Sequence, residues 1–394
     1  MPNPSRTERR FTPSAWACLP LLLAWGRATE AQAADGLVLD ATRTLVFANA
    51  EDIALGGSGA AFSTAAPGTA LSPAAAANRR QEADAPVTFG LLLLQARISG
   101  PRNGLDVGDL GTPLDEEVRV FDLALAGGYR NAAIGLLAAG AYYRVNHSWL
   151  AVSEGHVSGA VSLLDGHLTL GAGPRLLAMR VSAADEHRDY LGTGVEAGAL
   201  VSNWHHAWNF AVTARSGAVA RAERDEWEGL AAAQLPPELV AGIGWSNVSS
   251  LPGEKRGIPV RLMADVVVDA PVRDAVAIES VLTGQPIARG AWYTVSPRAG
   301  AEVDVWRDRL RLRGGGYLEP SRTALSGPRP HATGGFELRL FRVHALDHRI
   351  NLNLAWQVGA DYAPRYFHGA WLGINLWQEG EMGGQAAPRG AIDE

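Results

Sequence analysis

The chain has 394 residues, a formal net charge of −6 and 47% hydrophobic residues. This length is enough for one large domain or two smaller ones, and a mildly acidic chain without basic runs argues against nucleic acid as a partner. After the first 33 residues, no stretch approaches the about 18 apolar residues of a membrane-spanning helix, so insertion into a bilayer would have to be by strands.

Residues 1–33 have the pattern of a secretory signal peptide. Arginines lie among the first ten residues, an apolar stretch covers 15–25, and the small-residue sequence Ala-Gln-Ala follows at 31–33. This order of a charged, an apolar and a small-residue region is typical of a cleaved signal. The single cysteine, Cys18, lies in the apolar stretch. We therefore expect a mature chain without thiols, which excludes disulfides, cysteine metal sites and cysteine nucleophiles.

Residues 34–85 differ from the rest of the chain in being rich in alanine and glycine. Glycines allow tight, irregular backbone, and small residues allow close approach to other surfaces. A flexible linker is the alternative, but a linker would be more polar. We expect a compact hatch that plugs the lumen of the barrel described next. Two short runs define it: Gly56, Gly57 and Gly59 in the first, and Ser72, Pro73 and Ala74 in the second.

From residue 86 the chain alternates apolar and polar or small residues with period two. The cleanest case is 350–358, where Ile350, Leu352, Leu354, Trp356 and Val358 share one face. Apolar exterior and polar interior residues on a closed sheet are what a bilayer requires. The pattern predicts an all-β fold, a fourteen-stranded antiparallel transmembrane β-barrel over 86–377. The expected strands are 86–99, 116–129, 132–146, 155–164, 167–182, 190–201, 205–217, 237–248, 258–269, 291–305, 308–318, 331–344, 348–360 and 366–377.

The expected connections alternate between short turns and longer loops, with the short side periplasmic. Loops 147–154 and 183–189 belong to the long side, and 218–236 is expected to form a short amphipathic helix over the mouth. Loop 270–290 is the longest and carries apolar residues, so it is a candidate capture site for a ligand, ordinary loop packing being the alternative. Its candidate residues are Val276, Ile278, Val281 and Leu282.

Charged residues of the hairpin around Trp306-Arg307 are expected to form a ladder in the lumen. A turn there would pair Asp304 with Arg309, Glu302 with Arg311, and Gly300 with Arg313, all on one face. Arginines at mid-bilayer facing lipid would each cost about 2–4 kcal/mol, so this face should point inward. The ladder either fixes the structure or binds a carboxylate. The alternative to a barrel is a soluble sandwich whose solvated face carries the ladder. The ladder residues are Glu302, Asp304, Arg309, Arg311 and Arg313.

Several segments, in order along the chain, resemble the FadL-type family of outer-membrane transporters for long-chain fatty acids and aromatic hydrocarbons. In the expected hatch these are Gly56-Gly57-Ser58-Gly59-Ala60 and Ser72-Pro73-Ala74, where the family usually has Asn-Pro-Ala. Further matches are Leu235-Pro236-Pro237-Glu238-Leu239-Val240-Ala241-Gly242-Ile243, Pro297-Arg298-Ala299-Gly300-Ala301-Glu302-Val303, Leu310-Arg311-Leu312-Arg313-Gly314-Gly315-Gly316-Tyr317 and Glu319-Pro320-Ser321. The resemblance implies fourteen strands, an N-terminal hatch and passive uptake.

We therefore expect a channel in the outer membrane of a Gram-negative bacterium that takes up small hydrophobic compounds. The alternative is a non-transporting barrel that acts as a scaffold or as a periplasmic or secretion partner. We expect no catalytic site, no cofactor and no metal, because no metal-ligand, phosphate-loop or nucleophile motif occurs. The expected partners are a hydrophobic small molecule and the lipid bilayer. A polar tail, 378–394, follows the last strand.

Overall fold

The computed structural model describes most of the chain in fourteen segments. The expected signal segment 1–33 and residues 380–394 of the tail lie outside the described residues. The described residues are 37–42, 49–78, 87–97, 116–145, 147–183, 186–203, 207–222, 230–247, 258–283, 286–306, 309–324, 327–345, 350–363 and 367–379.

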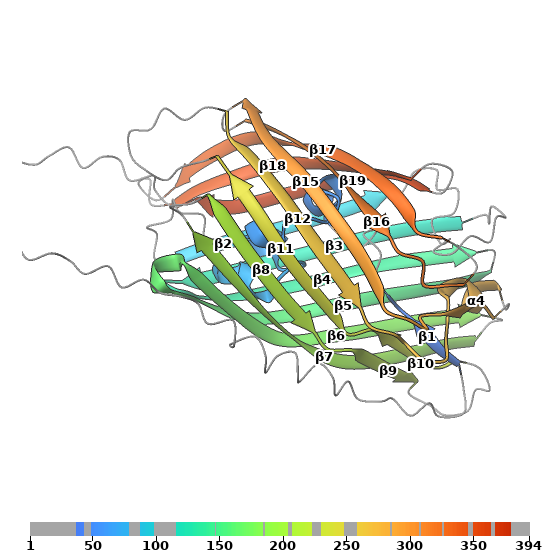
Figure 1. Cartoon of the computed structure of the whole chain (residues 1–394). Coiled ribbons are helices and arrows are strands. Elements are labelled where there is room, and N and C mark those ends of the chain that lie inside the picture. Colours follow the sequence, from blue (N-terminus) through green and yellow to red (C-terminus); the bar gives the residue numbers. More distant parts are fainter. Residues whose placement is uncertain are drawn as a thin grey trace, which may run out of the picture.

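Long antiparallel strands form one closed sheet (Figure 1). They are β2 (Val87–Arg97), β3 (Glu116–Tyr129), β4 (Ala132–Val145), β5 (Ser148–Leu163), β6 (Leu168–Ala183), β7 (Glu186–Asn203), β8 (Trp208–Arg215), β11 (Glu238–Ser246), β12 (Val260–Asp269), β15 (Thr294–Trp306), β16 (Leu310–Glu319), β17 (Arg329–Ala345), β18 (Ile350–Ala363) and β19 (Phe367–Glu379). Each pairs with the next in this order, and β19 pairs with β2. The ladder returns to its first strand, so the sheet is a barrel.

Side chains alternate between the two faces of this barrel. On β18, Trp356 is 43% exposed, whereas its neighbours Ala355 and Gln357 are fully buried. Apolar residues face outward on the other strands too, which is the arrangement that the period-two pattern predicts. Outward apolar side chains include Phe121, Leu123, Ile134, Val157, Leu176, Val195, Phe210, Leu262, Val295, Leu312, Leu372 and Ile374.

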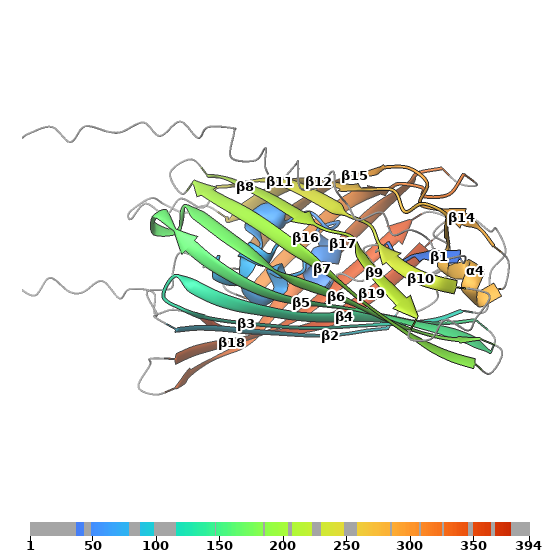
Figure 2. The ribbon, with the colours of Figure 1, turned by 90° about the horizontal axis from the view of Figure 1, so that it is seen from below.

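A small helical segment lies inside the barrel, between strands of opposite sides in both views (Figures 1 and 2). It comprises α2 (Ala50–Ala54), η3 (Ala60–Phe62), α3 (Ala65–Gly68) and η4 (Pro73–Ala77). Wall glycines surround it, because a Cβ on each of them would lie within 3.1 Å of an atom of 49–78. These glycines are Gly135, Gly171, Gly198, Gly242, Gly300, Gly315, Gly335 and Gly359. We call residues 49–78 the inner segment.

Short elements fill one end of the barrel, which we call the mouth end (Figure 2). They are β1 (Leu37–Asp40), β9 (Ala218–Ala222), β10 (Leu230–Leu235), β13 (Ala275–Val276), α4 (Ile278–Thr283) and β14 (Ala288–Arg289). The expected helix over 218–236 is wrong for 218–222 and 230–235, where β9 and β10 pair antiparallel with Ala233 opposite Ala220; residues 223–229 lie outside the described residues. β1 pairs in parallel with both β10 and β13.

Two expected loops are mostly strand. β5 already begins at Ser148, so 147–154 belongs almost entirely to that strand. β6 extends to Ala183 and β7 begins at Glu186, so 183–189 is also largely paired. The small and polar residues of these ranges hid strands that extend the wall of β5, β6 and β7 toward the mouth end.

No helix of the described chain is both long enough and apolar enough to cross a membrane.

Candidate functional site

The barrel interior near the mouth end is apolar. Inward side chains of β4, β5, β6 and β7 converge there with residues from β1, β10 and α4. We call this group the apolar interior cluster. Its large members are Leu39, Ile53 of the inner segment, Val120, Tyr143, Val145, Leu150, Val152, Leu177, Met179, Val181, Tyr190, Leu230, Leu235, Ile278, Leu282 and Trp371.

The polar atom of Tyr190 does not interrupt this cluster. Its hydroxyl donates a hydrogen bond of 2.9 Å to the carbonyl oxygen of Leu230 on β10. A buried phenol needs such a partner, since an unpaired hydroxyl in an apolar environment costs free energy. The hydroxyl of Tyr190 is therefore satisfied within an otherwise largely apolar cluster.

The wall on the other side of the interior carries charge. His331 of β17 lies between two carboxylates, with Nδ1 3.0 Å from Asp361 and Nε2 3.0 Å from Glu319. Its ring stacks on Tyr317 at 4.2 Å, and the Tyr317 hydroxyl donates to Asp361 at 2.7 Å. Both ring nitrogens face acceptors, so this geometry suits an imidazolium ion. Arg329 lies 3.0 Å from Glu319 and supplies the second positive charge that balances the two carboxylates.

A second ion cluster lines β5 to β8. His156 lies 2.9 Å from both Glu154 and Glu196, and Arg215 donates to Glu196 at 3.2 Å. Arg215 also donates to the carbonyl oxygen of Ala70 at 2.6 Å, which ties the inner segment to the wall. These buried charges pair with one another, as burial requires.

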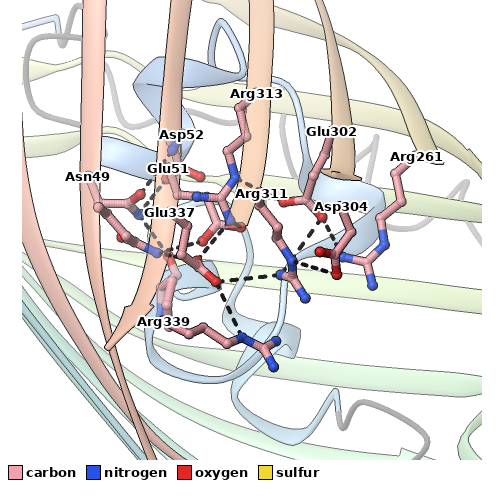
Figure 3. Close-up of polar contacts among 12 residues, drawn as sticks. Asn49, Glu51, Asp52, Arg261, Glu302, Asp304, Arg311, Arg313, Glu337 and Arg339 are labelled. Carbon is pink, nitrogen blue, oxygen red and sulfur yellow. Dashed lines mark hydrogen bonds and ion pairs between the residues drawn. The ribbon is translucent and has the colours of Figure 1, made fainter. Parts of the chain in front are cut away.

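The largest polar contact between wall and inner segment centres on Arg313 of β16 (Figure 3). Its guanidinium lies 2.9 Å from Glu302, 3.0 Å from Glu337 and 3.3 Å from Glu51 of α2. Gln357 donates to Glu51 at 3.1 Å and to Glu337 at 2.9 Å. Thr333 of β17 also donates to the carbonyl oxygen of Ala54 at 3.2 Å, so three neighbouring wall strands, β16, β17 and β18, bind this helix of the inner segment.

The ladder lies on the inward face, but its register differs from the expected one. Glu302 pairs with Arg313 and Asp304 with Arg311, because Trp306 pairs with Leu310 across a longer turn than expected and a bulge between Asp304 and Trp306 takes back one residue of that shift. The shift is two residues, and an even shift leaves every side chain on its original face. Arg309 lies at the turn with an exposed side chain.

Backbone amides of the inner segment bind a carboxylate of the wall. Asp265 on β12 accepts hydrogen bonds from Gly59 at 2.9 Å and from Ala60 at 3.0 Å. Gly56 has a φ of +65°, and a Cβ there would lie 2.6 Å from the backbone nitrogen of Gly316. Gly57 also has a positive φ, of 69°. The glycine run therefore supplies left-handed backbone and close approach to the wall.

The second run of the expected hatch begins η4. Ser72 is fully buried and its hydroxyl accepts a hydrogen bond of 3.3 Å from the amide of Ala74, with Pro73 in the first turn. Serine caps helices about as well as asparagine does, so Ser72 serves as the N-cap of η4. The amide of Ala74 and the carbonyl of Pro73 lie against Gly171 of β6.

Asp40 of β1 ties the start of the described chain to the mouth end. It is fully buried, and its Oδ2 accepts from Nε of Arg322 at 2.7 Å and lies 3.4 Å from Nε of Arg289. Burial alone would raise the pKa of Asp40, but the two guanidinium groups and the Thr42 hydroxyl outweigh it and lower the pKa below its ordinary value. Asp40 is therefore a carboxylate at neutral pH.

The expected capture loop folds back into the mouth end. Ile278 and Leu282 of α4 belong to the apolar interior cluster, and Val281 packs against it half-buried. Val276 is buried on β13. Sequence reasoning missed the other contributors to this cluster, such as Leu39 and Tyr143. For Tyr143 the only signal in the sequence was its inward-facing position in the alternation along β4, and for Leu39 there was none.

The described residues contain no group of three or more histidine, cysteine, aspartate or glutamate side chains that could hold a metal ion. The interior thus offers an apolar surface, paired charges and a tethered inner segment.

Comparisons with known proteins bear on the fold. No family model matches the sequence, and no curated protein matches it. Among solved structures, the CymD monoaromatic hydrocarbon channel is similar with a TM-score of 0.52 at 14% identity, over 85% of this chain and 98% of that one. A deltaS2S3 mutant of the TodX monoaromatic hydrocarbon channel has a TM-score of 0.50 at 12% identity, over 86% and 100%. The chain thus shares its β-sheet architecture with these channels.

Proposed function

We propose that this protein is an outer-membrane channel through which small hydrophobic compounds pass without an energy source. In this proposal residues 86–377 form a fourteen-stranded transmembrane barrel, 34–85 form its hatch, and the mouth end faces the outside of a Gram-negative cell. Monoaromatic hydrocarbons and long-chain fatty acids are the candidate ligands. The short turns would face the periplasm, as in other outer-membrane barrels.

The observation that carries the proposal is the apolar interior cluster. A barrel that conducts water-soluble solutes has a polar lumen, whereas here Leu150, Leu177 and Met179 are fully or almost fully buried inside. Burying apolar surface stabilises a bound hydrocarbon by about 25 cal/mol per Å². A hydrophobic compound would therefore partition into this part of the barrel, and an ion or sugar would not.

The hatch would control when a ligand can pass through the barrel. The inner segment occupies the barrel on the side of the cluster away from the mouth end, and polar contacts such as Arg313–Glu51 and Asp265–Gly59 bind it to the wall. Polar ties of this kind can exchange with water when the segment shifts. The ligand would pass once the hatch has moved.

The fold supports the proposal through the two similar channels, both of which are described as monoaromatic hydrocarbon channels. The resemblance of the hatch and of the late hairpins to the FadL-type family points the same way. The same ligand class is therefore the first to test.

Uptake of radiolabelled toluene and oleate by whole cells tests the proposal, in a host without its own hydrophobic-compound channel. Cells with the protein should accumulate one of the probes at least about tenfold faster than cells with the empty vector, a difference of 1.4 kcal/mol in barrier. A thiol-specific cross-link between Ala76→Cys and Ala133→Cys, which pack in one cluster, should pin the hatch and abolish uptake. Equal uptake with and without the protein, together with co-purification of a partner, would instead favour the scaffold role.

A further inference from the structure

Toward the mouth end of the barrel, the pairing between β11 and β12 comes to an end. These two strands pair from Ser246 opposite Arg261 to Glu238 opposite Asp269. Beyond Asp269 the chain of β12 leaves the wall, whereas β10 continues the line of β11 toward the mouth end with Leu230–Leu235. β10 would therefore have a free edge on that side, with unpaired backbone groups.

The N-terminal strand β1 covers that edge. Val38 lies opposite Ala232 and Leu39 opposite Ala233, and the amide of Ala41 donates to Gln234 at 2.9 Å. β1 covers the edge by parallel pairing, in contrast to the antiparallel pairing of the barrel strands, and only four residues form the strand. A short parallel strand is held by few hydrogen bonds, so its place in the sheet depends on its side chains.

Those side chains join β1 to both the apolar interior and the mouth-end ion cluster. Leu39 is fully buried in the apolar interior cluster, and Val38 is 6% exposed among Ala232, Val272 and Ala275. Asp40 supplies the carboxylate between Arg289 and Arg322, which are 1% and 3% exposed.

Arg289 depends on Asp40 for its counter-charge. Its Nε and Nη1 are buried and have no hydrogen-bond acceptor within the part of the chain that the structure describes, so its nearest counter-charge there is Asp40 at 3.4 Å. Arg322 is better satisfied, since it also donates to Thr294 at 3.1 Å. The ion pairing therefore favours the state in which β1 is in place.

We propose that β1 is a removable strand, a latch, whose withdrawal opens the side of the barrel beside β10 and joins the apolar interior cluster to the outside. This inference rests on the proposed function for what passes through the opening. The same N-terminal stretch leads from Asp40 into α2 at Ala50, so movement of the hatch and release of the latch would be mechanically coupled.

Opening of the latch can be measured without transport. In the purified full-length protein, Leu39→Cys should react slowly with a water-soluble maleimide, because the site is fully buried. Adding Asp40→Asn removes the carboxylate between the two arginines and should raise the labelling rate at least about tenfold. Asp189→Asn is the matched control: it removes the carboxylate of an exposed pair with Arg180, and labelling should not change. Equal rates in all three proteins would overturn the latch.

Locking the latch tests its part in transport. Val38→Cys and Ala275→Cys are register partners on β1 and β13. Their disulfide should abolish toluene uptake, and a reductant should restore it. Ala241→Cys and Val266→Cys, register partners with exposed side chains on β11 and β12, should form a disulfide with uptake unchanged. Full uptake by the oxidised latch variant would overturn the inference. If the unmodified protein takes up no probe, the proposed function fails, while the labelling experiment still decides whether the latch opens.

Discussion

Arg313 of the wall strand β16 lies 3.3 Å from Glu51 of the inner helix α2 while it also binds Glu302 and Glu337 (Figure 3). One guanidinium thus holds carboxylates of two wall strands and of the inner segment. All four side chains are at most about one-fifth exposed, with Glu51 at 20% the most accessible. The arrangement makes Arg313 the main electrostatic tie of the inner segment.

Removing this tie should destabilise both the inner segment and the barrel. Arg313→Gln leaves buried carboxylates without their counter-charge, and breaking a buried ion pair costs about 3–5 kcal/mol. The denaturant midpoint of the purified protein should fall accordingly. Arg180→Gln breaks an exposed pair with Asp189 and should leave the midpoint unchanged. A small, equal effect of the two substitutions would show that Arg313 does not hold the inner segment.

Adjacent glycines of β16 provide a steric test of where the inner segment lies. A Cβ on Gly315 would lie 2.4 Å from the carbonyl carbon of Leu55, whereas a Cβ on Gly314 would meet nothing within 4 Å. Gly315→Ala should therefore displace the inner segment and destabilise the protein by about 1–3 kcal/mol. Gly314→Ala should be nearly neutral. Thermal unfolding monitored by gel mobility measures both, and equal behaviour would contradict the position of Leu55.

Asp265 should slow hydrogen–deuterium exchange at the backbone amides of Gly59 and Ala60. It accepts from the backbone of Gly59 and Ala60, and loss of a charged acceptor costs a buried donor about 1–3 kcal/mol. In Asp265→Ala, hydrogen–deuterium exchange at these amides should accelerate by about 5- to 150-fold. The amide of Ser202 near the end of β7, which donates to the carbonyl oxygen of His167, serves as the internal reference. Unchanged exchange at Gly59 and Ala60 would refute this tether.

Charge on the outer face should be costly if that face meets lipid. Leu176 lies outward on β6 and is 40% exposed. Leu176→Arg should destabilise the protein folded in a bilayer by about 2–4 kcal/mol if the site is near the bilayer midplane. The same substitution should have little effect on a water-exposed surface. Equilibrium folding into liposomes distinguishes the two outcomes.

Much of the wall follows from the sequence because period-two alternation is a local property. β3 covers 116–129 as expected. The period-two alternation alone also predicts that Glu302 and Asp304 point into the barrel. The register of that hairpin does not, because the bulge beside Trp306 depends on the geometry of the turn. Parity survives such a shift, which is why the ladder still faces the lumen.

The elements at the mouth end were not predictable by the same route. Ala231, Ala232 and Ala233 favour a helix locally, but pairing with β9 and β1 makes them a strand, so tertiary contacts override propensity. The pair Asp40–Arg322 joins residues 282 positions apart in the chain. No local pattern marks Leu37–Asp40 as a strand, since its partners are edges that exist only in the folded barrel.

The most direct test of the account is to locate a hydrophobic ligand in the protein. A photoreactive alkylbenzene, incubated with the membrane-embedded protein and mapped by mass spectrometry, should label Tyr143, Leu150, Met179 and Tyr190 in a manner that excess toluene suppresses. Labelling of outward residues such as Leu372 should not be suppressed, because lipid-facing sites do not saturate. Labelling confined to outward residues, or insensitive to toluene throughout, would contradict an interior path for hydrophobic compounds.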